Sequence, residues 1–141
     1  MEDGKSENEE DRELKMENKI NSFEELQAWQ SARELVRFVY PIFRRAPASR
    51  DFGLRGQAQD VAISVMTNVA EGFERAHLQE KLQFYNIARA SCGEVRSLSY
   101  VMIDAEYISN PEHKTLLELA MQTGKLVSGL MRSTRSRIAK P

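Results

Sequence analysis

The side chains best placed for chemistry are polar groups set beside seams of valine and alanine. They are Gln57, Asn68, Glu71, Ser91 and Glu94. An amide or a carboxylate buried in such a seam without partners is costly. We therefore interpret the five residues as a hydrogen-bonded network that fixes the register of two helices. The alternative is a polar pocket or a contact between subunits.

Metal chemistry has one candidate motif. Glu74 and His77 match the Glu-x-x-His spacing of carboxylate-bridged metal bundles, which need a second copy of the motif and two further glutamates. The only other histidine, His113, has Asn110 three residues before it instead of a glutamate. Two histidines do not complete the usual ligand set, so we predict no metal and no cofactor.

Nucleophilic chemistry has one candidate, the single cysteine Cys92. It lies on the apolar face of a predicted helix, where buried thiols are usually small core residues. Catalysis would need an activating base or a helix N-terminus beside the thiol, and the sequence places neither there. We therefore predict no catalytic residue and no enzymatic activity. A metal-dependent or thiol enzyme is the rival interpretation from another class.

Basic side chains form two groups that could bind an anionic partner. Those of the first predicted helix and its end are Arg33, Arg37, Arg44 and Arg45, and those near the C-terminus are Arg132, Arg135 and Arg137. If the two helices are neighbours, the arginines could join into a patch that tracks the phosphates of RNA or DNA or contacts a protein partner. The alternative is a solvated helix face, because acidic residues are interspersed and no aromatic residue is available for stacking.

The charge of the chain is uneven along its length. Residues 1–22 carry eight acidic and four basic side chains, whereas residues 125–141 carry five basic side chains and no acidic one. With so few apolar residues, residues 1–21 are predicted to form a disordered acidic tail. We interpret it as a solubilising extension; the alternative is an arm that competes with nucleic acid for the basic C-terminus. Residues 22–132 are predicted to form the folded domain, and residues 133–141 a basic tail.

The composition is that of one ordinary globular domain. The chain has 141 residues, 41% hydrophobic and 29% charged, which is enough to enclose a core without a disulfide or a structural metal. No apolar run approaches the roughly 20 residues that span a bilayer, so no membrane association is predicted. A single cysteine suits a reducing compartment, which favours the cytoplasm.

Apolar residues recur at spacings of three and four throughout the domain, and no segment alternates with period two. A first helix should begin near Ser22 with a capping box to Glu25, and Pro41 should kink or end it. Asp51 should cap a second helix that runs to about Phe73. A third helix is predicted over 78–107, and a fourth from the segment 109–112 onward. Four such helices with short connections predict an all-α, antiparallel up-and-down bundle.

The second and third helices carry more apolar residues than one core needs. Outside the main seams lie Ile63, Met66 and Phe73 on one helix, and Phe84, Ile87 and Val101 on the other. An isolated bundle would leave several of these side chains in water, so a subunit interface is predicted.

Several motifs in register resemble one known family. They are Phe23–Leu26 with Trp29, Phe52–Leu54 with Gln57, Asn68–Gly72, and Ala88–Ser91 with Glu94. Over about Phe23 to Arg132 they resemble the four-helix-bundle proteins named for the 23S rRNA intervening sequences that encode some members. The resemblance implies a left-handed bundle that assembles into a homopentameric ring. It also implies distant kinship with the accessory protein of diversity-generating retroelements, a basic pentamer that binds a reverse transcriptase and nucleic acid.

Departures from the family pattern weaken a nucleic-acid role. Gln59 and Asp60 lie where the family usually has two arginines, His77 replaces a capping serine, and Lys81 replaces a phenylalanine. The leading hypothesis is therefore a cytoplasmic, non-enzymatic homo-oligomeric scaffold or adaptor that binds a protein partner, with RNA or DNA as a further partner. The alternative within this class is a purely structural, self-assembling protein without nucleic-acid binding.

Overall fold

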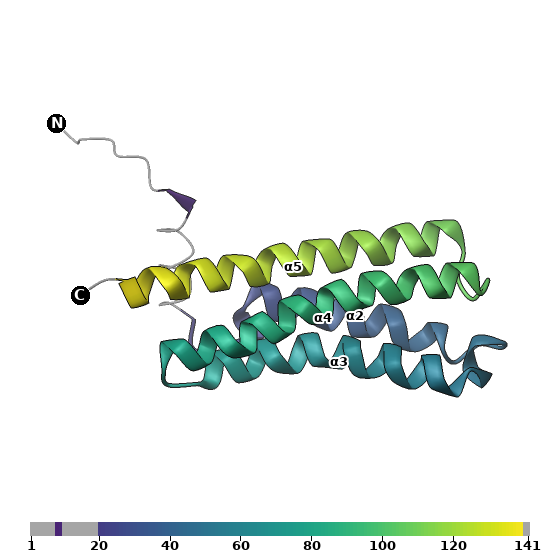
Figure 1. Cartoon of the computed structure of the whole chain (residues 1–141), viewed down its shortest axis with the longest axis horizontal. Helices are drawn as coiled ribbons and strands as arrows, with labels where there is room; N and C mark the ends of the chain where they lie inside the picture. The colour runs from purple at the N-terminus through teal and green to yellow at the C-terminus, as the bar shows by residue number, and fades with distance from the viewer. Residues whose placement is uncertain (1–7, 10–19, 140–141) are drawn as a thin grey trace.

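The computed structural model describes residues 8–9 and 20–139, and within them the chain is all-α, as predicted. Four long helices follow one another: α2 (Gln27–Ile42), α3 (Phe52–Glu74), α4 (Leu78–Asp104) and α5 (Asn110–Ala139) (Figure 1). Two short 3-10 turns, η1 (Phe23–Glu25) and η2 (Ala48–Arg50), precede α2 and α3. Helix α4 packs between α3 and α5, and α2 closes the bundle against both of them. The four-helix bundle predicted from the sequence is confirmed.

The start of the first helix was predicted too early. Ser22 makes no capping hydrogen bond with its side chain, and Leu26 adopts an extended conformation that separates η1 from α2. The carboxylate of Glu25 accepts a hydrogen bond from the Asn21 backbone N–H at 3.0 Å, one residue before the position that a capping box on Ser22 requires. The α-helix therefore begins at Gln27.

Two other boundaries follow the sequence closely. Pro41 is the penultimate residue of α2, which ends at Ile42 as expected for a proline late in a helix. Asp51 caps α3, because its Oδ1 accepts a hydrogen bond from the Leu54 N–H at 3.2 Å. Both predictions are confirmed.

Helix α4 ends at Asp104, three residues before the predicted end at Tyr107. Glu106 has a positive φ of 62°, which places it in the left-handed region. The Tyr107 N–H then bonds the Met102 carbonyl at 2.9 Å, and the Glu106 N–H bonds the Ile103 carbonyl at 3.0 Å. These two bonds form a Schellman motif, which usually carries glycine where this chain has Glu106.

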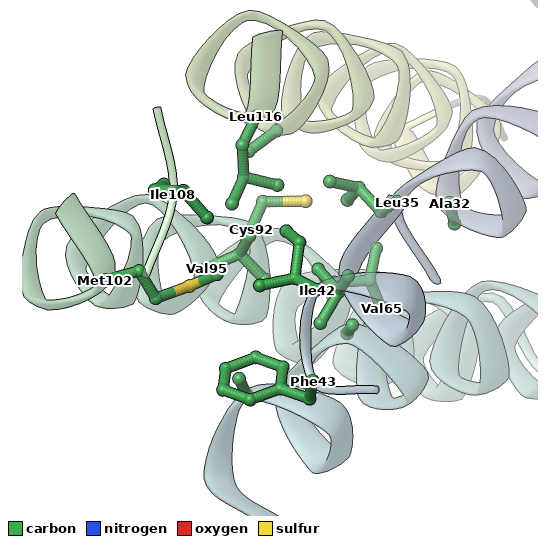
Figure 2. Close-up of a cluster of buried hydrophobic side chains, with 14 of the residues drawn as sticks. Ala32, Leu35, Ile42, Phe43, Val65, Cys92, Val95, Met102, Ile108 and Leu116 are labelled. Carbon is green, nitrogen blue, oxygen red and sulfur yellow. The ribbon is translucent and has the colours of Figure 1, made fainter. Parts of the chain in front are cut away.

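The core has two apolar clusters stacked along the bundle. One contains Leu35, Val65, Val95 and Leu116 among its members (Figure 2). The other is built around Tyr85, with the remaining buried members Leu26, Ala28, Val69, Ala88, Val127 and Met131. Both clusters take side chains from all four helices, so each ties the whole bundle together.

A polar layer lies where the two clusters meet. The Ser31 and Thr123 hydroxyls are 2.6 Å apart between α2 and α5, and the Ser64 and Ser91 hydroxyls are 2.9 Å apart between α3 and α4. Along its own helix, each of these residues lies within five positions of a member of each cluster. Because a slip of any helix would separate the pairs, the layer specifies the register of the bundle.

The folded domain extends further toward the C-terminus than residue 132. Helix α5 continues to Ala139, and both Ser133 and Thr134 are buried, with hydroxyls that donate to the Leu130 carbonyl. Residues 133–139 of the predicted basic tail are thus the end of α5. Most of the predicted acidic tail, residues 1–7 and 10–19, lies outside the described residues, as do residues 140–141.

Candidate functional site

The predicted polar network is present in part, and its centre is a residue that the sequence did not single out. Asn68 Nδ2 donates to the Ser64 carbonyl at 2.8 Å and to Ser64 Oγ at 3.0 Å, and Ser64 Oγ lies 2.9 Å from Ser91 Oγ. The Asn68 amide is therefore bonded to its own helix one turn back, while Ser64 connects α3 to α4. This chain of hydrogen bonds fixes the packing of the two helices.

The other three predicted members of the network lie at the surface. Gln57, Glu71 and Glu94 are exposed, and no hydrogen bond or ion pair joins them to one another within the described part of the chain. The expectation that Glu71 is buried beside valine and alanine is wrong, because the carboxylate points outward from α3. Gln57 and Glu71 are each seven residues from Ser64, so the three lie along one stripe of α3.

A matching stripe runs along α4. Ile87, Glu94 and Val101 are also spaced seven residues apart, on the side of α4 where Ser91 contacts α3. Ile87 is 47% exposed and Val101 is 48% exposed. The two stripes together form one surface, called here the α3–α4 flank and defined by Gln57, Ser64, Glu71, Ile87, Glu94 and Val101.

The remaining predicted interface residues are more buried than expected. Ile63, Met66, Phe73 and Phe84 are all half-buried. Met66 and Phe73 pack against the two core clusters. Only Ile87 and Val101 of the six predicted apolar residues are exposed.

The predicted arginine patch is not assembled as one surface. On α2, Arg33 Cζ lies 5.8 Å from the centroid of the Trp29 ring, and Arg37 Nη1 pairs with Glu34 Oε1 at 3.1 Å. Arg33 and Arg37 are both exposed to solvent. Arg44 and Arg45 follow the end of α2, at the end of the bundle where α5 begins. Arg132 and the arginines after it lie at the opposite end, because α5 runs antiparallel to α2 (Figure 1).

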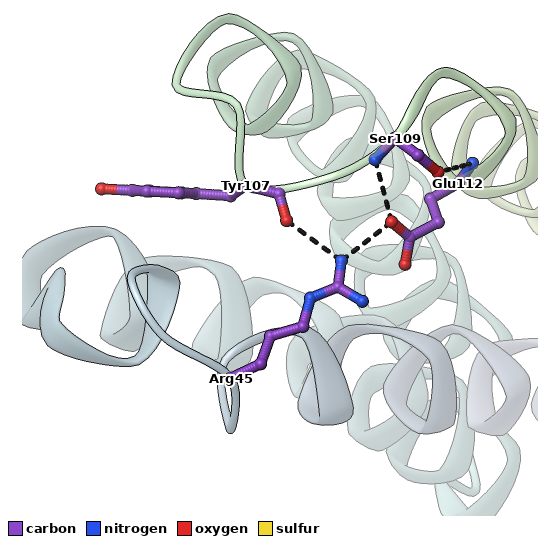
Figure 3. Close-up of polar contacts among 4 residues, drawn as sticks. All are labelled: Arg45, Tyr107, Ser109 and Glu112. Carbon is purple, nitrogen blue, oxygen red and sulfur yellow. Dashed lines mark hydrogen bonds and ion pairs between the residues drawn. The ribbon is translucent and has the colours of Figure 1, made fainter.

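Arg45 has a structural role that accounts for its charge. Its Nη2 donates to the Tyr107 carbonyl at 3.0 Å and to Glu112 Oε1 at 2.8 Å (Figure 3). Glu112 Oε1 also accepts from the Ser109 N–H at 2.8 Å, and Ser109 Oγ accepts from the Glu112 N–H at 3.2 Å, which completes a capping box at the start of α5. The hydrogen bond from Arg45 lowers the pKa of Glu112 to about 2, with the Ser109 bonds acting in the same direction.

Four basic residues that the sequence did not group together line one groove. They are Arg89 and Arg96 of α4 and Lys125 and Arg132 of α5. They lie along a cavity of about 1060 Å³ that is also bordered by Ile20, η1 and the start of α2, and Gly124 and Ser128 form part of its wall. The α4–α5 groove, as we call it, is defined by these six residues. The sequence does show that the two residues of each basic pair are seven positions apart. This spacing places each pair on one face of its helix and could have revealed the groove.

The groove and the α3–α4 flank lie on different sides of α4. Arg89 and Arg96 are three and four residues from Cys92, which faces α5: a Cβ added at Gly124 would lie 3.7 Å from the Cys92 Cβ. Ile87 and Val101, by contrast, lie on the side of α4 from which Ser91 contacts α3. One helix thus presents an apolar stripe on one side and a basic row on the other.

The residues considered for nucleophilic and metal chemistry are placed as follows. Cys92 is buried, and burial raises the pKa of its thiol to about 12, so it is protonated and the prediction of a core residue is confirmed. Glu74 and His77 are both exposed around the turn between α3 and α4. No group of three His, Cys, Asp or Glu side chains suited to a metal ion occurs among the described residues.

Lys81, one of the departures from the family pattern, is a buried lysine that caps a helix. Its Nζ donates to the Phe73 carbonyl at 2.6 Å and to the Gly72 carbonyl at 3.3 Å, at the C-terminal end of α3. A cation there satisfies the last carbonyls of the helix and complements its dipole. This role was not predictable from the sequence, because Lys81 lies eight and nine residues from its two acceptors, across a turn.

Comparison with known proteins agrees with the bundle. No helix within the described residues is both long and apolar enough to cross a membrane. No curated protein matches the chain, so the similarity to the retroelement accessory protein stays a prediction. The profile of one family, the 23S rRNA-intervening sequence protein family, matches residues 24–129, which cover η1 to most of α5. Since this match spans most of the chain and nearly all of the bundle, the protein belongs to the 23S rRNA-intervening sequence protein family.

Proposed function

We propose that this protein is a non-enzymatic, homo-oligomeric scaffold whose subunits meet through the α3–α4 flank. The observation that carries the proposal is the exposed pair Ile87 and Val101, about half exposed each and aligned on one stripe of α4. A partner subunit that lies along this side of α4 would bury both side chains, whereas a monomer leaves them in water.

The polar members of the flank fit the same role. Gln57 and Glu71 on α3 and Glu94 between the two apolar residues on α4 are exposed and offer hydrogen-bonding groups to a partner subunit. Protein interfaces commonly have an apolar centre with a polar rim of this kind. Full burial of the exposed halves of Ile87 and Val101 is worth about 1 kcal/mol each, so neighbouring surface must contribute to a stable contact.

Assembly gives the scaffold its function. An oligomer repeats every exposed patch of the subunit, so a partner protein that binds weakly at one copy gains affinity when it engages several. The resemblance to the family implies five subunits in a ring. In such a ring the flank of one subunit meets a different surface of the next subunit. The protonated, buried Cys92 supports a non-enzymatic role, and a single cysteine supports a cytoplasmic location.

A pair of surface variants tests the flank. Ile87→Lys combined with Val101→Lys places two charges in the proposed contact, and Phe52→Lys is the matched control because Phe52 is 69% exposed at the start of α3, away from the flank. The double variant should sediment as a folded monomer, whereas the control should keep the wild-type mass. Circular dichroism of each variant checks that it is folded. We expect folding because all three substituted positions are exposed.

Two results contradict the proposal. One is a double variant that keeps the mass of the wild-type assembly, because the flank would then lie outside the contact. The other is a control that dissociates as fully as the double variant, because any added charge would then suffice.

A further inference from the structure

We propose that the α4–α5 groove binds the backbone of a single-stranded nucleic acid. Four cations line it: Arg89 and Arg96 from α4, and Lys125 and Arg132 from α5. In each pair the residues are seven positions apart, which corresponds to two helical turns, or about 10 Å. The two pairs therefore form two rows that can contact successive phosphates of one strand.

Three of the four cations, all except Arg132, are available for a ligand. Arg89, Arg96 and Lys125 are exposed, and none of them forms an ion pair within the described residues. Arg89 Nη2 donates a hydrogen bond to the neutral amide oxygen of Asn86, Oδ1, at 3.2 Å. A phosphate that approaches these side chains therefore displaces water and counterions instead of protein carboxylates, which favours binding.

The wall between the cations permits close approach. Gly93 lies between Arg89 and Arg96 on α4, and a Cβ added there would meet no atom within 4 Å. On α5, Gly124 has no side chain and Ser128 has a short one. These small residues leave space between the basic side chains.

An aromatic side chain stands one turn beyond the basic row. Tyr100 follows Arg96 by four residues and is 55% exposed. Its ring packs edge-on against His113 of α5 at 4.8 Å between centroids, and His113 Nδ1 is 2.8 Å from the Ser99 hydroxyl. Tyr100 is thus a supported platform on which an unpaired base can stack, and stacking of this kind is typical of single-strand binding proteins.

An acidic polypeptide is the competing occupant. Glu9 and Glu25 also line the groove, and Glu9 Oε1 lies 3.7 Å from Arg132 Nη2. Carboxylates therefore reach the rim of the groove. The exposed tyrosine and the three arginines favour a strand with bases and phosphates over a peptide, because arginine recognises phosphate well and Tyr100 offers a stacking surface.

The groove is independent of the proposed subunit contact, since Arg89 and Arg96 lie on another side of α4 from Ile87 and Val101. Assembly through the flank would repeat the groove on every subunit. The failure of one proposal is therefore distinguishable from the failure of the other when the mass of each sample is measured together with its binding.

Fluorescence anisotropy with labelled oligo(U) and oligo(dT) strands of about 20 nucleotides, at about 50 mM salt and above, tests the proposal. The wild-type protein should bind, with a slope of log K against log salt of about −3 for four phosphate contacts. Replacing Arg89, Arg96, Lys125 and Arg132 by glutamine should weaken binding by about 100-fold or more. The matched control replaces Arg33, Arg37, Arg44 and Arg50, four exposed arginines outside the groove, by glutamine and should bind within about threefold of wild type.

Two single variants separate the base and phosphate contributions. Tyr100→Ala should weaken binding by about tenfold and leave the salt slope unchanged, because a stacked base carries no charge. Glu9→Gln should strengthen binding, because it removes a negative charge beside Arg132.

Three outcomes overturn the proposal. The first is no detectable binding of either strand at about 50 mM salt. The second is an equal loss of affinity in the control and in the groove variant. The third is a poly-glutamate peptide that binds the wild-type groove more tightly than an oligonucleotide of similar charge, which would assign the groove to an acidic polypeptide.

Discussion

Gly72 of α3 lies directly against the ring of the fully buried Tyr85 of α4. A Cβ added at Gly72 would be 2.5 Å from Tyr85 Cε1 and 2.7 Å from Cδ1, far inside contact distance. The absence of a side chain at residue 72 therefore lets α3 and α4 approach closely near their connecting turn. The same turn is held by Lys81, which caps the carbonyls of Gly72 and Phe73.

Gly72→Ala should destabilise the bundle. Alanine gains about 1 kcal/mol over glycine in a helix interior, but the methyl group must push aside a large ring in a packed core, at a cost of about 3 kcal/mol. The net loss should be about 2 kcal/mol, measured as a lower urea midpoint. Gly93→Ala is the control: it lies inside α4 with open space around it and should gain up to about 1 kcal/mol. A Gly72→Ala protein as stable as the wild type would contradict the described packing.

Glu106→Gly should stabilise the protein. Glu106 holds a positive φ of 62° in the Schellman motif that ends α4, a conformation that costs a non-glycine residue about 1 kcal/mol. Glycine should recover about that amount, seen as a higher melting temperature. Ala105→Gly provides the contrast, because Ala105 has an ordinary φ of −78°, and glycine there should lower stability. A gain at both positions would argue against the left-handed cap.

Stability should fall in acid through Glu112. Its pKa in the folded protein is about 2, below the ordinary value of 4.5, so the ionised carboxylate stabilises the fold above about pH 4.5. This contribution is lost as the pH falls from about 4.5 to 2. The Arg45 side chain is 48% exposed, so solvent screening limits the contribution to about 1 kcal/mol. Glu112→Gln should remove that part of the pH dependence of the unfolding free energy in urea titrations. If the variant lost as much stability in acid as the wild type, Glu112 would not be the group responsible.

The polar layer can be tested by a double-mutant cycle. The Thr123 hydroxyl donates to the Leu119 carbonyl at 2.8 Å, so at the 2.6 Å contact Ser31 is the donor and Thr123 the acceptor. Ser31→Ala and Thr123→Val should each cost about 1 kcal/mol. The double variant should cost less than the sum, with a coupling energy of about 1 kcal/mol in chemical denaturation. Strict additivity would show that the two hydroxyls do not interact.

Much of the fold was predictable because it depends on local patterns. Apolar spacing located all four helices, Pro41 and Asp51 set two of the boundaries, and Ser109 with Glu112 opened α5. The end of α4 was missed because its cap uses Glu106 where a glycine is the usual signal. The start of α2 was missed because Ser22 and Glu25 have the spacing of a capping box but belong to a 3-10 turn.

The candidate sites were less predictable because they depend on which faces meet. Asn68 and Ser91 were singled out from the sequence, but Ser64, which joins them, was not. Arg45 was assigned to a binding patch, yet it holds two loops together. The basic side chains of the groove come from two helices, so Arg89 and Lys125 line one cavity only when α4 is packed against α5.

Assembly of the subunits underlies the proposed scaffold, and the mass of the wild-type protein in solution tests it directly. Sedimentation velocity at about 50 µM should show one species at a multiple of the 16.2 kDa subunit, about 81 kDa if five subunits close a ring. A single, fully folded species at 16.2 kDa under the same conditions would contradict the proposed scaffold.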